Sequence, residues 1–236
     1  MKLGALALAA LALCAGASAQ DEAPHAEDAS RIAPEPGAQR VDGIAAVVGG
    51  LTPGPTVITL LESDVELRAR LAILRQSDLR TALGELPPSV LGASLKELLG
   101  EALIAAESVR LNMPEPSGAA VAEQRARLLG TRAQPSAARA LLSALGVNER
   151  EVAELIERRA RVDAFLQANL EGTLDTSEEA LAQAFQSEAH PFYGEPFEVA
   201  RDRFERWYAQ VKLEGAVERW IVTLSQRTPH RLLVTY

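Results

Sequence analysis

The chain is 236 residues long and carries a formal net charge of −8 at pH 7; 47% of its residues are hydrophobic but only 4% are aromatic. An acidic chain of this kind lacks the basic surface with which proteins bind nucleic acid, and that class of function is excluded. Its length allows one large or two small domains with a sizeable core, and the dominance of alanine and leucine favours closely packed helices.

Residues 1–19 predict an export signal. Lys2 precedes an uninterrupted apolar run that ends in the small residues Ala-Ser-Ala, which together are typical of a cleavable signal peptide. The run is shorter than the about 20 residues of a transmembrane helix, which disfavours a retained anchor. Lipidation at Cys14 is the other alternative. We expect cleavage after Ala19, export to the periplasm and no stable membrane insertion.

Residues 20–40 mix acids, alanine and three prolines with no apolar period. Such a segment cannot bury enough apolar surface to offset the entropy of ordering it, so we expect a flexible acidic tail. Folded structure is expected from residue 41 onward.

The segment 41–61 predicts a β-hairpin. Two short apolar runs, "VDGIAAVVGG" and "VITLL", are separated by the glycine and proline residues of a turn. Ser63, followed three residues later by Glu66, has the pattern of a capping box, in which the two side chains satisfy backbone amides at a helix start. We therefore predict a helix from Ser63 to about Leu83, directly after the hairpin.

Apolar periodicity and end signals predict six further helices. Asn112 stands where a left-handed residue ends a helix, Gly146 closes another, Asn148 with Glu151 forms a second capping pair, and Thr176 opens the next helix. The expected ranges are about 89–111, 117–129, 136–145, 148–170, 176–189 and 197–227.

The last residues, 231–236, read "RLLVTY", a β-branched and aromatic run that is typical of a strand. A lone strand needs partners, and the only other predicted strands lie in residues 41–61. We therefore predict a mostly α fold with a small antiparallel sheet, formed by the N-terminal hairpin and the returning C-terminal strand.

The order of these elements resembles the SurA-type periplasmic chaperones. Their hairpin and first helix follow the pattern V-x-x-V-V-x-x-x-x-I-x-x-S-D-V/L, and the matching residue types here are Val41, Val47, Val48, Ile58, Ser63, Asp64 and Val65. "LKELLGEALIAAESVRLNM", "LGVNEREVAELIERRARVDAFL" and "LDTSEEALAQAF" are similar to the helices that follow in that family. The resemblance covers nearly all of residues 41–190, the hairpin and helical core, and extends in general shape to the C-terminal helix and strand. We expect this helix and strand, residues 191–236, to pack back on the core.

The chain departs from this family where many relatives insert parvulin-type prolyl isomerase domains. Only "HPFYGEP", residues 190–196, lies at that point, and a folded domain needs at least about 50 residues. The resemblance therefore implies an ATP-independent chaperone, a holdase for unfolded envelope or outer-membrane proteins, without isomerase activity. The alternative is an envelope assembly subunit that uses the same fold to bind one folded partner.

No residue pattern points to an enzyme. The histidines His25, His190 and His230 fall in the tail, a joint and a strand edge, without the spacing of a metal site. Paired acids such as Glu178 and Glu179 suit the first turn of a helix, where the helix dipole favours them. We expect no catalytic residue, no metal and no cofactor.

The candidate client-binding residues are aromatic side chains of the joint and the last helix, namely Phe192, Tyr193, Phe197, Trp207 and Tyr208. A holding chaperone needs exposed apolar patches that catch unfolded segments. The alternative is that these rings pack the last helix onto the core. Core packing is favoured for Trp207, whereas for Phe192 and Tyr193, on a turn, the two interpretations are balanced. The apolar stripe expected on the last helix consists of Ala200, Phe204, Trp207, Val211 and Trp220.

Overall fold

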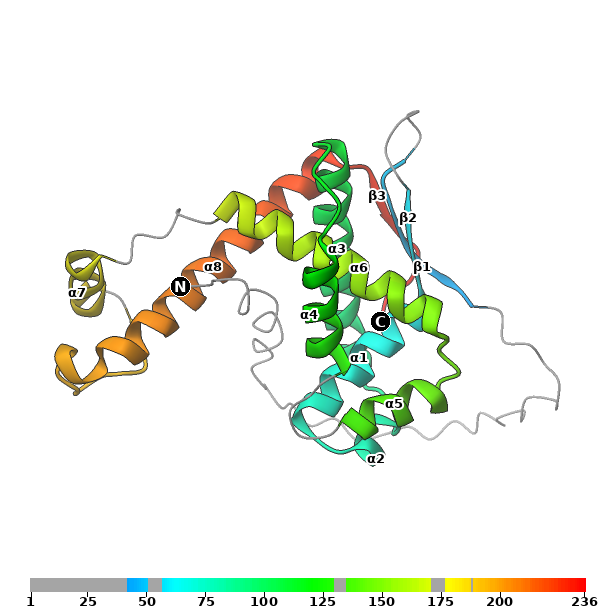
Figure 1. The fold of residues 1–236 in the computed structure, drawn as a ribbon, viewed down its shortest axis with the longest axis horizontal. Coiled ribbons are helices and arrows are strands. Elements are labelled where there is room, and N and C mark those ends of the chain that lie inside the picture. The colour runs from blue at the N-terminus through cyan, green and yellow to red at the C-terminus, as the bar shows by residue number, and fades with distance from the viewer. Residues whose placement is uncertain (1–41, 51–56, 130–134, 171–176, 188) are drawn as a thin grey trace, which may run out of the picture.

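A computed structural model describes residues 42–50, 57–129, 135–170, 177–187 and 189–236 (Figure 1). The predicted signal peptide and acidic tail lie outside these ranges. The described chain is mostly helical and has one small sheet, which confirms the predicted fold class. No helix in the part of the chain that the structure describes is long and apolar enough to cross a membrane.

The sheet joins the two ends of the folded chain, as predicted. Its three strands are β1 (Ile44–Val48), β2 (Ile58–Leu61) and β3 (His230–Leu232), antiparallel and in the order β2-β1-β3. The C-terminal strand is shorter than the predicted range 231–236 and begins one residue earlier. The Leu233 N–H still donates to the Ala45 carbonyl at 2.9 Å, so the pairing extends slightly beyond β3.

The first helix begins at a different cap from the one predicted. Helix α1 spans Glu62–Gln76, and its N-terminal cap is Leu61 rather than Ser63. The Asp64 carboxylate accepts the Leu61 N–H at 2.9 Å, while the Ser63 hydroxyl and N–H both donate to Asp42. Because β2 continues to Leu61 without a break, the helix starts before the serine and the Ser63–Glu66 capping box does not form.

The predicted helix to Leu83 is also interrupted. After Gln76 the chain turns at Ser77, and Asp78 caps a short helix α2 (Leu79–Ala82) by accepting the Thr81 N–H and hydroxyl, each at 2.8 Å. Aspartate competes for backbone amides in this way, which favours a new cap over continuation of the helix.

The remaining helices lie close to the predicted ranges. Asn112 and Gly146 adopt φ of 52° and 68°, and Asn148 and Glu151 cap each other's backbone N–H at 3.0 Å, which confirms these end signals. Thr176 lies outside the described residues; Ser177 accepts the Ala180 N–H at 3.3 Å. The helices are α3 (Pro88–Arg110), α4 (Gly118–Leu129), α5 (Pro135–Ala144), α6 (Glu149–Leu170), α7 (Glu178–Ser187) and α8 (Phe197–Arg227).

The body of the molecule has its main core between the sheet, α3, α6 and the C-terminal half of α8. Helix α3 lies at its centre, and a second apolar cluster joins α1, α2 and α5. Glycine lets α3 and α8 approach closely: a Cβ atom on Gly100 would lie 2.7 Å from Ile221 Cδ1.

Helix α8 serves two separate apolar clusters. Ala200 and Phe204 are buried near its start, and the next buried residue is Leu213, followed by Val217 and Leu224 in the body. Figure 1 shows the N-terminal part of α8 extending away from α1–α6, with α7 beside it. The stripe predicted for this helix is therefore wrong at its centre, where Val211 is exposed between the two clusters.

Removal of residues 231–236 should destabilise the hairpin as well as the tail, because an isolated two-stranded hairpin is marginal in water. We expect a loss of at least about 1 kcal/mol, roughly 2–4 °C in Tm, and faster amide exchange in β1. Thr235→Ala in the full chain is the control. A truncated chain that melts like the full one would contradict the role of β3.

Two glycines of α3 provide a matched test of the α3–α8 contact. Alanine favours a helix interior by about 1 kcal/mol over glycine, and a Cβ on Gly92 would find only Tyr236 Cβ, at 4.0 Å. Gly92→Ala should therefore raise Tm. Gly100→Ala should leave Tm unchanged, because the added Cβ meets Ile221 Cδ1, and it should raise Tm only in a chain that also carries Ile221→Val. An equal rise in Tm for both single variants would show that Ile221 or α8 moves aside at no cost, which would contradict a tight α3–α8 contact.

Candidate functional site

The five predicted aromatic residues come together in one lobe, here called the aromatic arm: residues 177–187 and 189–208. Phe192, Phe197, Trp207 and Tyr208 are half-buried around Leu181, Ala184 and the fully buried Phe204. Tyr193 is different, because 74% of its surface is exposed. The packing predicted for Trp207 thus occurs within the aromatic arm and not against the body, whose own tryptophan, Trp220, contacts Phe165 edge-on at 5.3 Å.

Phe204 is the centre of this lobe. Its ring lies 5.0 Å from Phe185, 5.6 Å from Trp207 and 5.7 Å from Tyr208, and 6.2 Å from Phe192, centroid to centroid. Edge-on and tilted contacts at these separations are the favoured geometries of aromatic pairs. Rings from α7, the turn and α8 therefore form a compact, mostly aromatic core around Phe204.

His190 fixes the turn that presents Tyr193. The Phe192 N–H donates to His190 Nδ1 at 3.1 Å, so the proton of the ring lies on Nε2, which donates to the Phe185 carbonyl at 2.8 Å. The neutral ring stacks between Phe185, at 4.3 Å, and Tyr193, at 4.8 Å. The sequence places His190 in a joint but gives no signal for this orienting role, which depends on three residues that only the fold brings together.

An open hollow of about 560 Å³ lies beside this stack. Its lining is a mixture of aromatic rings and small polar groups from the end of α7 and the turn: Phe185, Gln186, Ser187, Ala189, His190, Phe192, Tyr193 and Gly194. Val199, on the next turn of chain, is also exposed. The aromatic arm therefore offers apolar surface to solvent next to a recess that can receive side chains of another polypeptide.

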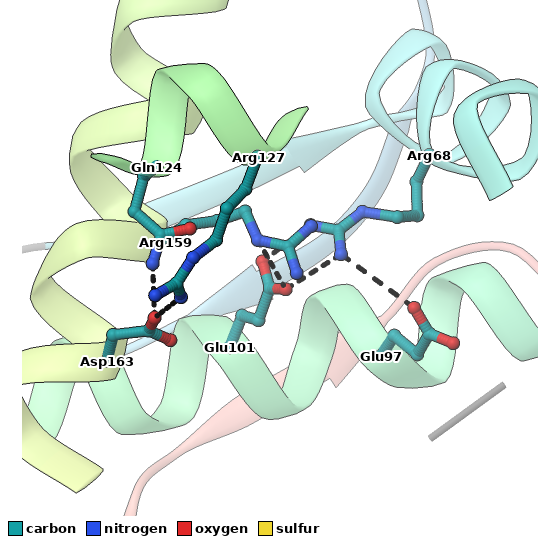
Figure 2. A network of polar contacts seen from close by, with 7 residues as sticks. All are labelled: Arg68, Glu97, Glu101, Gln124, Arg127, Arg159 and Asp163. Carbon is teal, nitrogen blue, oxygen red and sulfur yellow. Dashed lines mark hydrogen bonds and ion pairs between the residues drawn. The ribbon is translucent and has the colours of Figure 1, made fainter. Parts of the chain in front are cut away.

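The body holds a different feature, a network of buried charges that the sequence reading missed (Figure 2). Arg68 of α1 donates two parallel hydrogen bonds to Glu101 of α3, at 2.8 and 2.7 Å, and both residues are only 2% exposed. Glu97 approaches Arg68 to 3.8 Å, and Arg159 of α6 approaches Glu101 to 3.7 Å. One signal was available: Glu101 lies on the same helix face as the apolar residues Leu98 and Ala105, where a charge must find a partner.

The charges decide the protonation of this buried pair. Burial alone would raise the pKa of Glu101, but Arg68 and Arg159 outweigh it and hold that pKa below its ordinary value. Burial would likewise lower the pKa of Arg68, and Glu101 more than compensates, so the pKa of Arg68 is raised. Both side chains therefore stay ionised, and together with Arg159 they link three helices rather than supplying an acid or a base.

Asp163 of α6 extends the network to α4. It accepts hydrogen bonds from Gln124 and from Arg127, the latter at 3.0 Å. Gln124 is the one buried residue of α4, so the most deeply buried contact between α4 and α6 is polar. Burial raises the pKa of Asp163 to about 6, and the charges of Arg127 and Arg159 reduce that effect without cancelling it.

No group of histidine, cysteine, aspartate and glutamate suited to a metal ion occurs among the described residues. No protein-family model matches the chain, and no curated protein matches it significantly. The resemblance to the SurA-type chaperones therefore stays a prediction from the motifs. Of the two features, the charge network is internal and structural, and the aromatic arm is the candidate binding site.

Asp163→Asn should stabilise the protein at neutral pH. The folded state holds the Asp163 proton with a pKa of about 6, above the ordinary 3.8, so its contribution to stability is complete below 3.8 and is lost as pH rises through about 6. The loss is at most about 3 kcal/mol, and about 1–2 kcal/mol after allowance for partial solvent access. Asparagine is neutral throughout and still accepts a hydrogen bond, so the variant should melt higher at pH 7.5 and equal to the parent near pH 4.

The matched control is Glu123→Gln, since Glu123 accepts from the same Arg127 but is exposed. Such surface pairs contribute about 0–1 kcal/mol, so its pH profile should follow the parent. An Asp163→Asn variant that is less stable at pH 7.5 would mean that the ion pair with Arg127 outweighs burial.

Proposed function

We propose that this chain is an exported, ATP-independent chaperone that holds unfolded envelope proteins, outer-membrane proteins among them, and has no prolyl isomerase activity. The observation that supports the proposal is the aromatic arm, a lobe of aromatic rings with an exposed tyrosine and an open recess, carried on a helix that extends away from the body.

The rings suit weak and exchangeable binding. Full burial of one apolar side chain contributes about 1.5–3 kcal/mol, and ordering a flexible client offsets part of that gain. The recess of about 560 Å³ has room for a few side chains at a time. A client would therefore bind loosely at many alternative segments, which is what a holding chaperone requires.

The position of the aromatic arm supports the same function. In the SurA-type chaperones that this sequence resembles, an isomerase domain commonly follows the helix that corresponds to α7. Here a turn at residues 189–196 connects α7 to α8 and carries His190, Phe192 and Tyr193. We infer that this chain keeps the holding activity of such proteins and uses the turn itself as a contact surface.

The test is light scattering of a urea-denatured outer-membrane β-barrel protein diluted into buffer, alone or with an equal concentration of this chain. We expect the parent chain to suppress the scattering. Tyr193→Ser with Val199→Ser should suppress it less than half as well at an unchanged Tm, because both side chains are exposed and their loss leaves the lobe's core intact.

Val222→Ser is the matched control, since Val222 is an exposed valine on the part of α8 that packs on the body. It should behave like the parent. A well-folded parent chain that does not suppress scattering would contradict the proposal and favour the alternative, an assembly subunit with one folded partner. Full suppression by the double variant would remove the aromatic arm as the site.

A further inference from the structure

The sheet, at the opposite end of α8 from the aromatic arm, exposes its own apolar side chains. They are Ile44, Val57, Leu232, Leu233 and Tyr236, all on or next to the strands. Leu232, on β3, is 51% exposed, while Val234, two residues later, packs against the main core. Of these, Leu232 and Leu233 lie on or directly after the edge strand β3, and grouped apolar side chains mark an interaction site more often than single exposed residues do.

The backbone of β3 has an unpaired side. Arg231 lies opposite Val47, and the flanking hydrogen bonds run from Gly49 N–H to the Pro229 carbonyl at 2.8 Å and from Leu233 N–H to the Ala45 carbonyl at 2.9 Å. Since N–H and C=O groups alternate in direction along a strand, those of His230 and Leu232 point away from β1. No described strand pairs with that side, because the order is β2-β1-β3.

Within β3 the outer edge has no proline and no bulge, and its protection against strand pairing is a length of three residues and a single fixed charge. Proteins blunt an exposed edge with proline, lysine or a bulge. The irregularity in this sheet lies between β1 and β2, at Ile44 and Ala46, and not at β3. Pro229 precedes the strand, and within it Arg231 is the one fixed charge.

We propose that the outer edge of β3 binds an extended polypeptide segment as an added antiparallel strand, one with an acidic residue between two apolar residues. In that register the residue opposite Arg231 forms a non-hydrogen-bonded pair, in which side chains are closest. Arg231 makes no ion pair with any residue the structure describes, so a carboxylate there supplies its missing partner. The apolar residues on either side of that carboxylate would cover Leu232. Its side chain lies on the same face of the strand as Val234, which packs against the main core.

Other occupants fit this edge less well. The N-terminal segment 20–40 is acidic, but its three prolines remove backbone donors and it offers no alternating apolar residues. A second copy of β3 would bring two basic edges together, with His230 and Arg231 on each, and supply no carboxylate. The site is separate from the aromatic arm, and it stands whether or not the aromatic arm holds clients.

The probe is a labelled peptide containing Val-Thr-Val-Glu-Val, titrated into the full chain. Its valines would lie opposite Val234, Leu232 and His230, and its glutamate opposite Arg231. We expect the backbone amides of His230 and Leu232 to gain protection from hydrogen exchange. N-methylation of the valine amides should weaken binding at least tenfold, whereas N-methylation of the threonine and glutamate amides, which point outward, should not.

Leu232→Pro tests the protein side of the same bonds. It removes an outward N–H that the fold does not use, and edge strands tolerate proline at such a position, so Tm should hold while affinity falls at least tenfold. Leu232→Lys is the control if the proline variant unfolds, since it keeps the N–H and should retain the response to N-methylation. Arg231→Glu should weaken binding of the glutamate peptide. A peptide with lysine in place of the glutamate should bind the Arg231→Glu chain better than it binds the parent chain.

Three results would overturn the proposal. They are equal binding by the two N-methylated peptides, loss of binding in the Tyr193→Ser, Val199→Ser chain, and a concentration-dependent dimer abolished by Leu232→Pro without any peptide binding. The second would place the peptide at the aromatic arm, and the third would assign the edge to a second copy. Failure of the light-scattering test leaves all three readouts interpretable, because none of them uses an aggregating client.

Discussion

The bidentate pair between Arg68 and Glu101 is the contact on which the body depends. Glu101 lies in the middle of α3, the helix at the centre of the main core, and Arg68 and Arg159 reach it from α1 and α6. Two charges withdrawn from water are stable there only because each satisfies the other, and loss of one partner from such a pair typically costs about 3–5 kcal/mol. The pair thereby fixes which faces of the three helices meet.

That fixed body is what gives α8 a defined direction. The C-terminal half of the helix is held by the main core and by β3, and its N-terminal part carries Phe204 and the aromatic arm. Phe204 lies in one apolar cluster with Leu181, Ala184 and the surrounding rings, so the two lobes use different chemistry: a network of buried ion pairs joins helices of the body, and mostly aromatic packing holds the aromatic arm together. A single continuous helix connects them (Figure 1). The surface at Tyr193 is thus positioned by residues at the far end of the chain.

The sequence predicted features that are decided locally and missed those decided at a distance. The Asn148–Glu151 caps, the left-handed Asn112 and both ends of α8 depend on neighbouring residues, and all were confirmed. The Ser63 cap did not form because helix α1 begins directly after β2, at Glu62, so that Ser63 already lies inside the helix. Val211 was misplaced because a period of 3.6 assumes one buried face, whereas α8 faces two clusters in turn. The sequence named the aromatic residues of the joint and the last helix as candidates, but it did not predict that they gather with α7 in a cluster of their own. The pairing of Arg68 with Glu101 joins residues 33 positions apart, which no local pattern predicts. The hydrogen bonds of His190 to Phe185 and Phe192 are local, but a single histidine in a joint does not indicate them.

The sheet has a consequence for the order in which the molecule can form. Val48 pairs with His230, so the first and last elements of the folded chain are direct neighbours. During synthesis the hairpin emerges before β3, so β1 has only β2 as a partner until residues 230–232 have been made. Contacts with so large a sequence separation close slowly, and an incomplete sheet exposes strand edges in the meantime. Any protease or competing strand that encounters the chain before β3 has formed therefore meets the unpaired edge of β1.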